Sequence, residues 1–188
     1  MESIVMANFR RDQYNRIVKN FEGFNKIEIR NMIVAAADRA ASAGLTATKK
    51  GIAREFTISG SALNKAVKKY KYGSGLGMAI GVNIRDNNRP LSEFKFGPKK
   101  HSARPIVEVK RGSPRKIKGS RFVAEVHGRT TILERTSKKS YPVRALYGPS
   151  AVGMFRANET IHQAVWDIIF DKFEERVIHE IDRRLFGV

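Results

Sequence analysis

Two glycine-rich segments contain residue types that occur in phosphate-binding and nucleophile motifs. GSGLG at residues 73–77 lacks the third glycine of the fingerprint G-x-G-x-x-G, because Met78 stands there, and a strand-like segment follows it instead of a helix. GPSAVG at residues 148–153 differs from the nucleophile elbow G-x-S-x-G, because Val152 replaces its second glycine. We therefore interpret the first segment as a hinge and discount Ser150 as a nucleophile.

Histidine and carboxylate side chains can form metal or acid–base sites, but their spacing here does not favour one. No two histidines lie four residues apart, and the spacing of Glu175 and His179 is a common coincidence on a charged helix. Four acidic residues cluster near the C-terminus, where a metal site would need ligands from other helices. They are Asp167, Asp171, Glu174 and Glu175. These residues do not assemble into a catalytic set, and we expect no catalytic residue, metal or cofactor.

Basic side chains are the strongest chemical signal. The chain has 36 lysine and arginine residues against 18 acidic ones, and residues 95–121 contain ten basic residues and one acidic residue. Such an excess favours a polyanionic partner, usually nucleic acid, with a solvated basic surface as the alternative. Aromatic residues are sparse in this region, so we expect contact with the phosphate backbone without base recognition. The candidate contacts are Lys99, Lys100, Arg104, Arg115, Lys116, Lys118 and Arg121.

The first third of the chain is expected to be helical. Residues 1–26 form either an arm or a short helix. An alanine-rich helix over residues 27–43 should end at Gly44, because glycine is the preferred residue after a helix C-terminus. A second helix near residues 49–56 and a third over residues 61–70 should follow, so that 27–71 form a helical region.

The middle of the chain alternates between apolar and polar residues, as half-buried strands do. Segments of this kind recur between residues 77 and 136, separated by short turns and basic loops, which predicts an antiparallel meander. The basic loop GSPRKIKGS at residues 112–120 is long enough to project as a hairpin tip.

A long helix over residues 158–186 should close the fold. Its apolar residues recur at every fourth position from Ile161 to Leu185. Since a helix turns about 100° per residue, this stripe winds around the helix and should contact different neighbours at its two ends. One neighbour should be the sheet, and the other is either a second part of the core or another subunit.

These elements predict an α+β fold, with short N-terminal helices, a central, mostly antiparallel sheet and a long C-terminal helix packed on it. The 188 residues suit a single domain over 27–188, and 41% hydrophobic content suits a globular one. The chain has no cysteine, which excludes disulfides and favours a reducing compartment. No segment reaches the length of a transmembrane helix, and the N-terminus lacks the order of a signal peptide, so we expect a cytoplasmic protein without a membrane partner.

Two longer segments resemble one known family. ILERTSKKSYPVRALYGPSAVGMF at residues 132–155 and FEERVIHEIDRRL at 173–185 resemble the minor tail protein Z family of tailed bacteriophages and prophages. The family's Pro–hydrophobic–Arg–x–Leu–Tyr–Gly–Pro–Ser run corresponds to Pro142, Val143, Arg144, Leu146, Tyr147, Gly148, Pro149 and Ser150. Its most specific part is the Tyr-Gly-Pro-Ser run at residues 147–150. Residues 34–69 and the segment RPLSEFKF at 89–96 are similar to the family's helices and its middle part, whereas residues 1–26 have no counterpart.

The resemblance implies a structural virion protein that completes the head-proximal end of the tail, in the head–tail connector or neck. It implies a ring of identical subunits, with six the expected number, that meets the tail terminator, connector or stopper proteins and the phage DNA. The protein would be made in the host cytoplasm and end in the virion. The alternative is a free nucleic-acid-binding protein without sequence preference.

A ring subunit needs contact surfaces, and the sequence offers candidates for them. Gly148 and Pro149 are expected to form a structural bend. The candidate subunit contacts are Tyr147, Met154, Phe173, Val177 and Ile181. On this interpretation Ile169→Asp should disrupt folding, whereas Val177→Asp should disrupt assembly.

Overall fold

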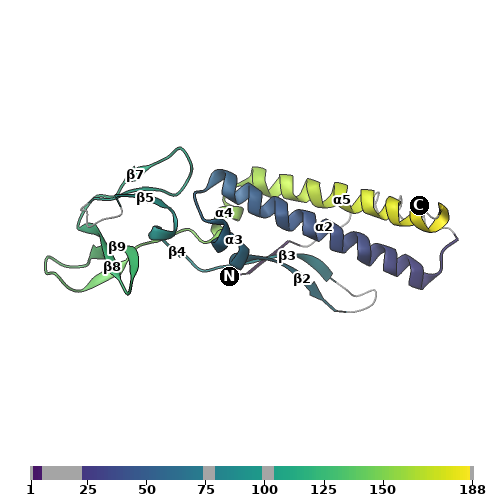
Figure 1. Cartoon of the computed structure of the whole chain (residues 1–188), viewed down its shortest axis with the longest axis horizontal. Helices are drawn as coiled ribbons and strands as arrows, with labels where there is room; N and C mark the ends of the chain where they lie inside the picture. The colour runs from purple at the N-terminus through teal and green to yellow at the C-terminus, as the bar shows by residue number, and fades with distance from the viewer. Residues whose placement is uncertain (1, 6–22, 74–78, 99–103, 187–188) are drawn as a thin grey trace.

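The computed structural model describes residues 2–5, 23–73, 79–98 and 104–186. These form an elongated helical body and a smaller lobe of short strands beyond one end of the body (Figure 1). The helices are α2 (Lys26–Glu55), α3 (Gly60–Ala66), the 3-10 helix η2 (Leu91–Glu93), α4 (Ala151–Arg156) and α5 (Glu159–Phe186). Within the described residues no helix is long and apolar enough to cross a membrane.

The strands form four small antiparallel sheets. The body contains β1 (Glu2–Val5), β2 (Val67–Tyr72) and β3 (Ala79–Arg85) in the order β1-β3-β2. One sheet of the lobe contains β5 (Lys95–Gly97), β6 (Ile106–Glu108) and β7 (Arg115–Lys116) in that order. The other has the order β10-β9-β8, with β8 (Arg121–Val126), β9 (Arg129–Arg135) and β10 (Val143–Ala145). A short pair of strands, β4 (Arg89–Pro90) and β11 (Tyr147–Gly148), lies between body and lobe.

The predicted α+β class is confirmed, but the single meander over 77–136 is wrong. β3 belongs to the body, where it pairs with β2 and β1, and the later strands divide between the lobe sheets and β4. The loop predicted at 112–120 contains β7, which pairs with β6. Residues 2–5 form a strand, so the helix considered for the N-terminus does not start there; residues 6–22 lie outside the described residues.

The predicted helix break at Gly44 is also wrong, because α2 runs unbroken from Lys26 to Glu55. The helix begins with a capping box, in which the Asn25 side chain accepts from the backbone N–H of Glu28 while the Glu28 carboxylate accepts from that of Asn25. Thr48, next to the start of the predicted second helix, donates its hydroxyl to the carbonyl oxygen of Gly44 within α2 (2.8 Å). This local bond satisfies the buried hydroxyl and leaves the helix intact.

The two glycines of α2 permit close packing against α5. A Cβ atom at Gly44 would lie 2.5 Å from Ile169 Cγ1, and one at Gly51 would lie 2.7 Å from Ile161 Cγ2. These two contacts show that the helices run in opposite directions. Buried residues recur every fourth position on both, which extends this register along the pair. They are Met32, Ala36, Ala40, Gly44, Thr48 and Ile52 on α2, and Ile161, Val165, Ile169, Phe173, Val177 and Ile181 on α5.

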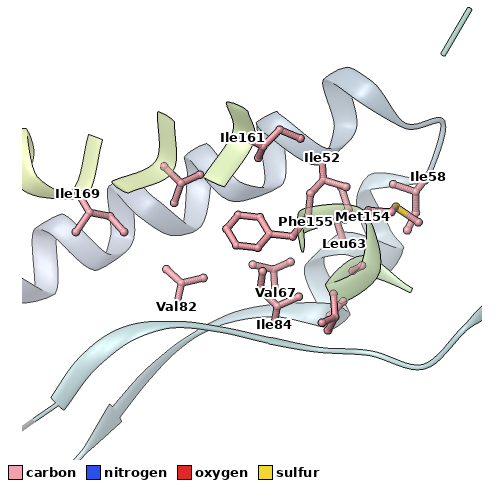
Figure 2. Close-up of a cluster of buried hydrophobic side chains, with 14 of the residues drawn as sticks. Ile52, Ile58, Leu63, Val67, Val82, Ile84, Met154, Phe155, Ile161 and Ile169 are labelled. Carbon is pink, nitrogen blue, oxygen red and sulfur yellow. The ribbon is translucent and has the colours of Figure 1, made fainter. Parts of the chain in front are cut away.

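The partner of α5 is therefore mainly α2, and α2 also contacts β2 and β3. Small residues of α2 face large residues of α5, so the winding apolar stripe of α5 is covered by the same chain. Phe155 and Met154 of α4 close the core beside Ile52 and Leu63 (Figure 2). The helix predicted for 158–186 is confirmed to within one residue at its start.

The helical region predicted over 27–71 ends early, because residues 67–72 form β2. Val67 is buried, packs in the core and pairs with Ile84, whereas the lysines that follow it face the solvent. Tyr70 pairs with Gly81 across the strands, and an aromatic ring opposite a glycine stabilises such a site. Pairing of this segment with β3 thus outweighs the helical pattern of the preceding residues.

Candidate nucleic-acid interface

The lobe is joined to the body through the segment that contains Tyr147 to Ser150. Gly148 pairs with Arg89, and a Cβ atom there would lie 2.9 Å from a ring carbon of Phe94. The Ser150 side chain accepts from the backbone N–H of Gly153 and so caps α4. The predicted bend at Gly148 and Pro149 falls where β11 ends and α4 begins, and the close approach of Phe94 leaves little room for a side chain at Gly148.

Asp86 strengthens this joint from the body side. Its carboxylate accepts from the backbone N–H of Ala151 (3.0 Å) and from the guanidinium of Arg89 (2.8 Å), which also pairs with Glu93. These bonds, chiefly the one to Asp86, raise the pKa of Arg89 above its ordinary value. A second connection forms where Thr57 donates to Val109 and Arg111 donates to Glu55, both through backbone N–H groups. The lobe is thus fixed to the body at two places.

Two of the three acidic residues in the lobe strands are already neutralised by neighbouring cations. Glu134 in β9 accepts from Arg121 in β8 (2.7 Å) and from Arg144 in β10 (2.7 Å). The hydrogen bond from Arg144 and then that from Arg121 hold the pKa of Glu134 below its ordinary value. Glu108 pairs with Lys95 across the β5–β6 ladder, and that bond chiefly lowers its pKa. Only Glu125 remains as an unpaired acid on these strands.

The remaining cations of the lobe are exposed and largely unbalanced. Residues 104–144 contain twelve basic and three acidic residues. Two of these acids pair with Arg121 and Arg144 of this range and with Lys95, which precedes it. Arg115, Lys116 and Lys118 are exposed and have no ion pair among the described residues. Arg115 and Lys116 are adjacent on β7, so their side chains project from opposite faces of that edge strand.

The other predicted phosphate contacts have different outcomes. Arg104 is exposed at the start of a described segment, with a positive φ of 67°. Lys99 and Lys100 lie outside the described residues. Arg121 is a correction: its guanidinium donates to Glu134 and to the carbonyl oxygen of Lys118 (2.8 Å), so its charge is compensated inside the sheet.

Sequence reasoning missed the two lysines at the tip of the β9–β10 hairpin. Lys138 and Lys139 are exposed and unpaired among the described residues. The tip is ordered by bonds from Thr136 to the carbonyl oxygen of Pro142 and from Ser137 to that of Tyr141. Two adjacent lysines between serines in a turn were the available signal, and they lie outside the basic stretch at residues 95–121.

The predicted subunit contacts are mostly wrong, because the chain buries them itself. Met154 lies in the core under α4, and the three candidates on α5 lie against α2. Those three are Phe173, Val177 and Ile181. Tyr147 is different, since 59% of it is exposed. It borders an open groove of about 680 Å³ between the β8–β9 hairpin and the β4–η2 segment, lined also by Val126, His127 and Leu133.

No group of three histidine or acidic residues among the described residues could hold a metal ion. The site consists of exposed, largely unpaired positive charges, which can bind polyanions or acidic surfaces. In comparisons with known proteins, no family model, no curated protein and no solved structure matches the chain.

Proposed function

We propose that the protein is a structural subunit of the phage tail, a tail completion or head–tail connector component that contacts the backbone of the DNA through its lobe. The proposal combines the family resemblance of residues 132–155 with the charge of the lobe. It assigns no turnover to the chain. Its partners would be further copies of itself, the neighbouring neck and tail proteins and the genomic DNA.

The observation that carries the DNA contact is the uncompensated positive charge of the lobe. Two of the three acids on its strands are paired internally, so most of the exposed lysine and arginine side chains face solvent without counterions from the described residues. Lysine and arginine bind phosphate groups whatever the base sequence, which suits a surface along which DNA passes. The rigid joint to the body would hold these charges in place as DNA moves.

The test is binding of labelled duplex DNA by fluorescence anisotropy over a series of salt concentrations. We expect the triple variant Arg115→Gln, Lys116→Gln, Lys118→Gln to bind at least about tenfold more weakly than wild type at low salt. Each lost phosphate contact should also reduce the slope of log K against log salt by about 0.9. Two duplexes of unrelated sequence should give the same result.

A matched control separates the lobe from general charge. Lys26→Gln, Arg39→Gln, Lys50→Gln removes the same three charges from exposed positions on α2. Its affinity should change by less than about threefold, because only distant charges are removed. Equal losses in both variants would show non-specific attraction and remove the lobe assignment. Tight DNA binding by a protein that stays monomeric would favour the free nucleic-acid-binding alternative.

A further inference from the structure

The outer face of α5 carries exposed apolar side chains that nothing among the described residues covers. Ile168 is 42% exposed and Ile178 is 46% exposed, although the buried stripe of the same helix is fully packed against α2. Single exposed isoleucines are ordinary, but these two flank a run of acidic residues on one side of one helix.

Acidic residues near these two isoleucines form a stripe along α5. Asp167, Asp171, Glu174 and Ile178 follow one another at steps of four, three and four, which places them on one face of the helix. Asp171 and Glu174 are exposed and make no ion pair among the described residues, whereas the adjacent Glu175 pairs with Lys172 (2.6 Å). This face is therefore acidic and partly apolar, in a chain that is otherwise strongly basic.

The tip of the β9–β10 hairpin has the complementary composition. Lys138 and Lys139 are exposed there, and Tyr141 is 77% exposed. The tip is held in shape by the bonds of Thr136 and Ser137 described above and by donation from the Lys139 N–H to the Ser137 hydroxyl oxygen (3.2 Å). A tip already ordered loses little conformational freedom when it binds.

We propose that the hairpin tip of one copy docks on the outer face of α5 of a second copy, with Lys138 and Lys139 against Asp171 and Glu174, and Tyr141 against the exposed isoleucines. The tip belongs to the lobe, beyond one end of the helix pair, so it does not reach the middle of its own α5 (Figure 1). The contact joins two different surfaces, and such head-to-tail contacts generate rings when the rotation closes.

This inference rests on the proposed self-assembly and names the surfaces that would mediate it. It differs from the DNA contact, which uses the cations around β7. The hairpin lysines could also attract DNA by charge alone, but DNA gives no reason for an exposed Tyr141 or for an unpaired acidic and apolar face on α5. A second copy of the chain accounts for both surfaces together.

The test is charge reversal followed by mixing, with mass measured by sedimentation velocity. One variant carries Asp171→Lys and Glu174→Lys, and the other carries Lys138→Glu and Lys139→Glu. We expect each alone to associate more than about tenfold more weakly than wild type, because like charges would face each other. When the two variants are mixed, they should associate again. The lysines introduced on α5 of one variant would face the glutamates introduced at the tip of the other, and the unchanged tip and α5 face would also be complementary. All four substitutions in one chain should likewise restore self-association.

Circular dichroism and urea unfolding show whether each variant is folded, and exposed positions should leave both unchanged. Tyr141→Ser adds a test without charge change: it should weaken association and leave DNA affinity as in wild type. If both charge-reversal variants self-associate as tightly as wild type, the docking surface is overturned but the proposed function stands. A wild type that remains monomeric under all conditions overturns the docking and the proposed self-assembly together, whereas loss of DNA binding alone would affect only the proposed function.

Discussion

At the scale of single residues, the packing of the helical body depends on two glycines of α2, which have no side chain. Gly44 and Gly51 allow α5 to lie so close to α2 that a methyl group at either position would collide with an isoleucine. Glycine is unfavourable inside a helix by about 1 kcal/mol relative to alanine. The close approach of the helices offsets that cost, because it brings the every-fourth-residue series of both helices into contact over their length.

Replacing Gly44 should therefore have opposite effects in two backgrounds. We expect Gly44→Ala alone to lower the free energy of unfolding by about 1–2 kcal/mol, because overpacking outweighs the gain in helix propensity. In a chain that already carries Ile169→Ala, the same replacement should raise it by about 0.5–1 kcal/mol, because the colliding atoms are gone. Urea unfolding of the four proteins measures both values. An increase in both backgrounds would contradict the close packing.

Glu134 should make the lobe sensitive to acid. Its pKa is lowered, so the carboxylate stabilises the fold at pH values above its ordinary pKa of 4.5, and this contribution is lost as the pH falls through the lowered value. The Glu134→Gln variant lacks that contribution. We expect its urea midpoint to fall below that of wild type at neutral pH and to approach it in acid. A difference that stays constant over this range would show that the pairs with Arg121 and Arg144 do not contribute.

At the scale of elements, α5 shows what a periodic pattern can and cannot predict. The spacing of its apolar residues located the helix and its buried residues, but not what they pack against. Val177 lies opposite Ala36 in the register of the pair and is 1% exposed, so it belongs to the core. The winding stripe stays covered along its length because α2 has the same four-residue repeat, which could have been recognised in its alanines.

Val177→Asp should therefore unfold the chain instead of selectively blocking assembly. Burying an unpaired carboxylate costs several kcal/mol, and we expect the free energy of unfolding to fall by more than about 3 kcal/mol, as for Ile169→Asp. Thermal unfolding by circular dichroism measures this, with Ile178→Asp on the outer face as the matched control. A stable Val177→Asp protein would place that side chain at a surface.

Other elements could not be assigned from the sequence for identifiable reasons. Glycine and threonine near residue 44 mimic a helix end and a new cap, yet the glycine serves packing and Thr48 bonds within the helix. The helix-to-strand change at Val67 leaves no turn residue to mark it. In the candidate interface, the basic loop was recognised, but the pairing of Arg121 and the importance of Lys138 depend on which strands become neighbours.

At the scale of the whole molecule, the positive and negative surfaces lie in different parts of the structure. The lobe has most of its acids paired and its cations exposed, whereas residues 156–188 have a net charge of −2 and present unpaired carboxylates on α5. An elongated subunit with a basic lobe and an acidic outer helix face suits both a DNA contact and a contact with another copy. The joint of Gly148, Ser150 and Asp86 fixes the distance between these two surfaces.

The measurement that tests the central claim most directly is the mass of the purified protein by light scattering at low and high salt. A connector subunit should form particles several times the 21.2 kDa of the chain at low salt, and these should dissociate as salt screens the contacts between oppositely charged surfaces. A mass of one chain at every salt and protein concentration would contradict the account, and with tight DNA binding it would identify a free nucleic-acid-binding protein.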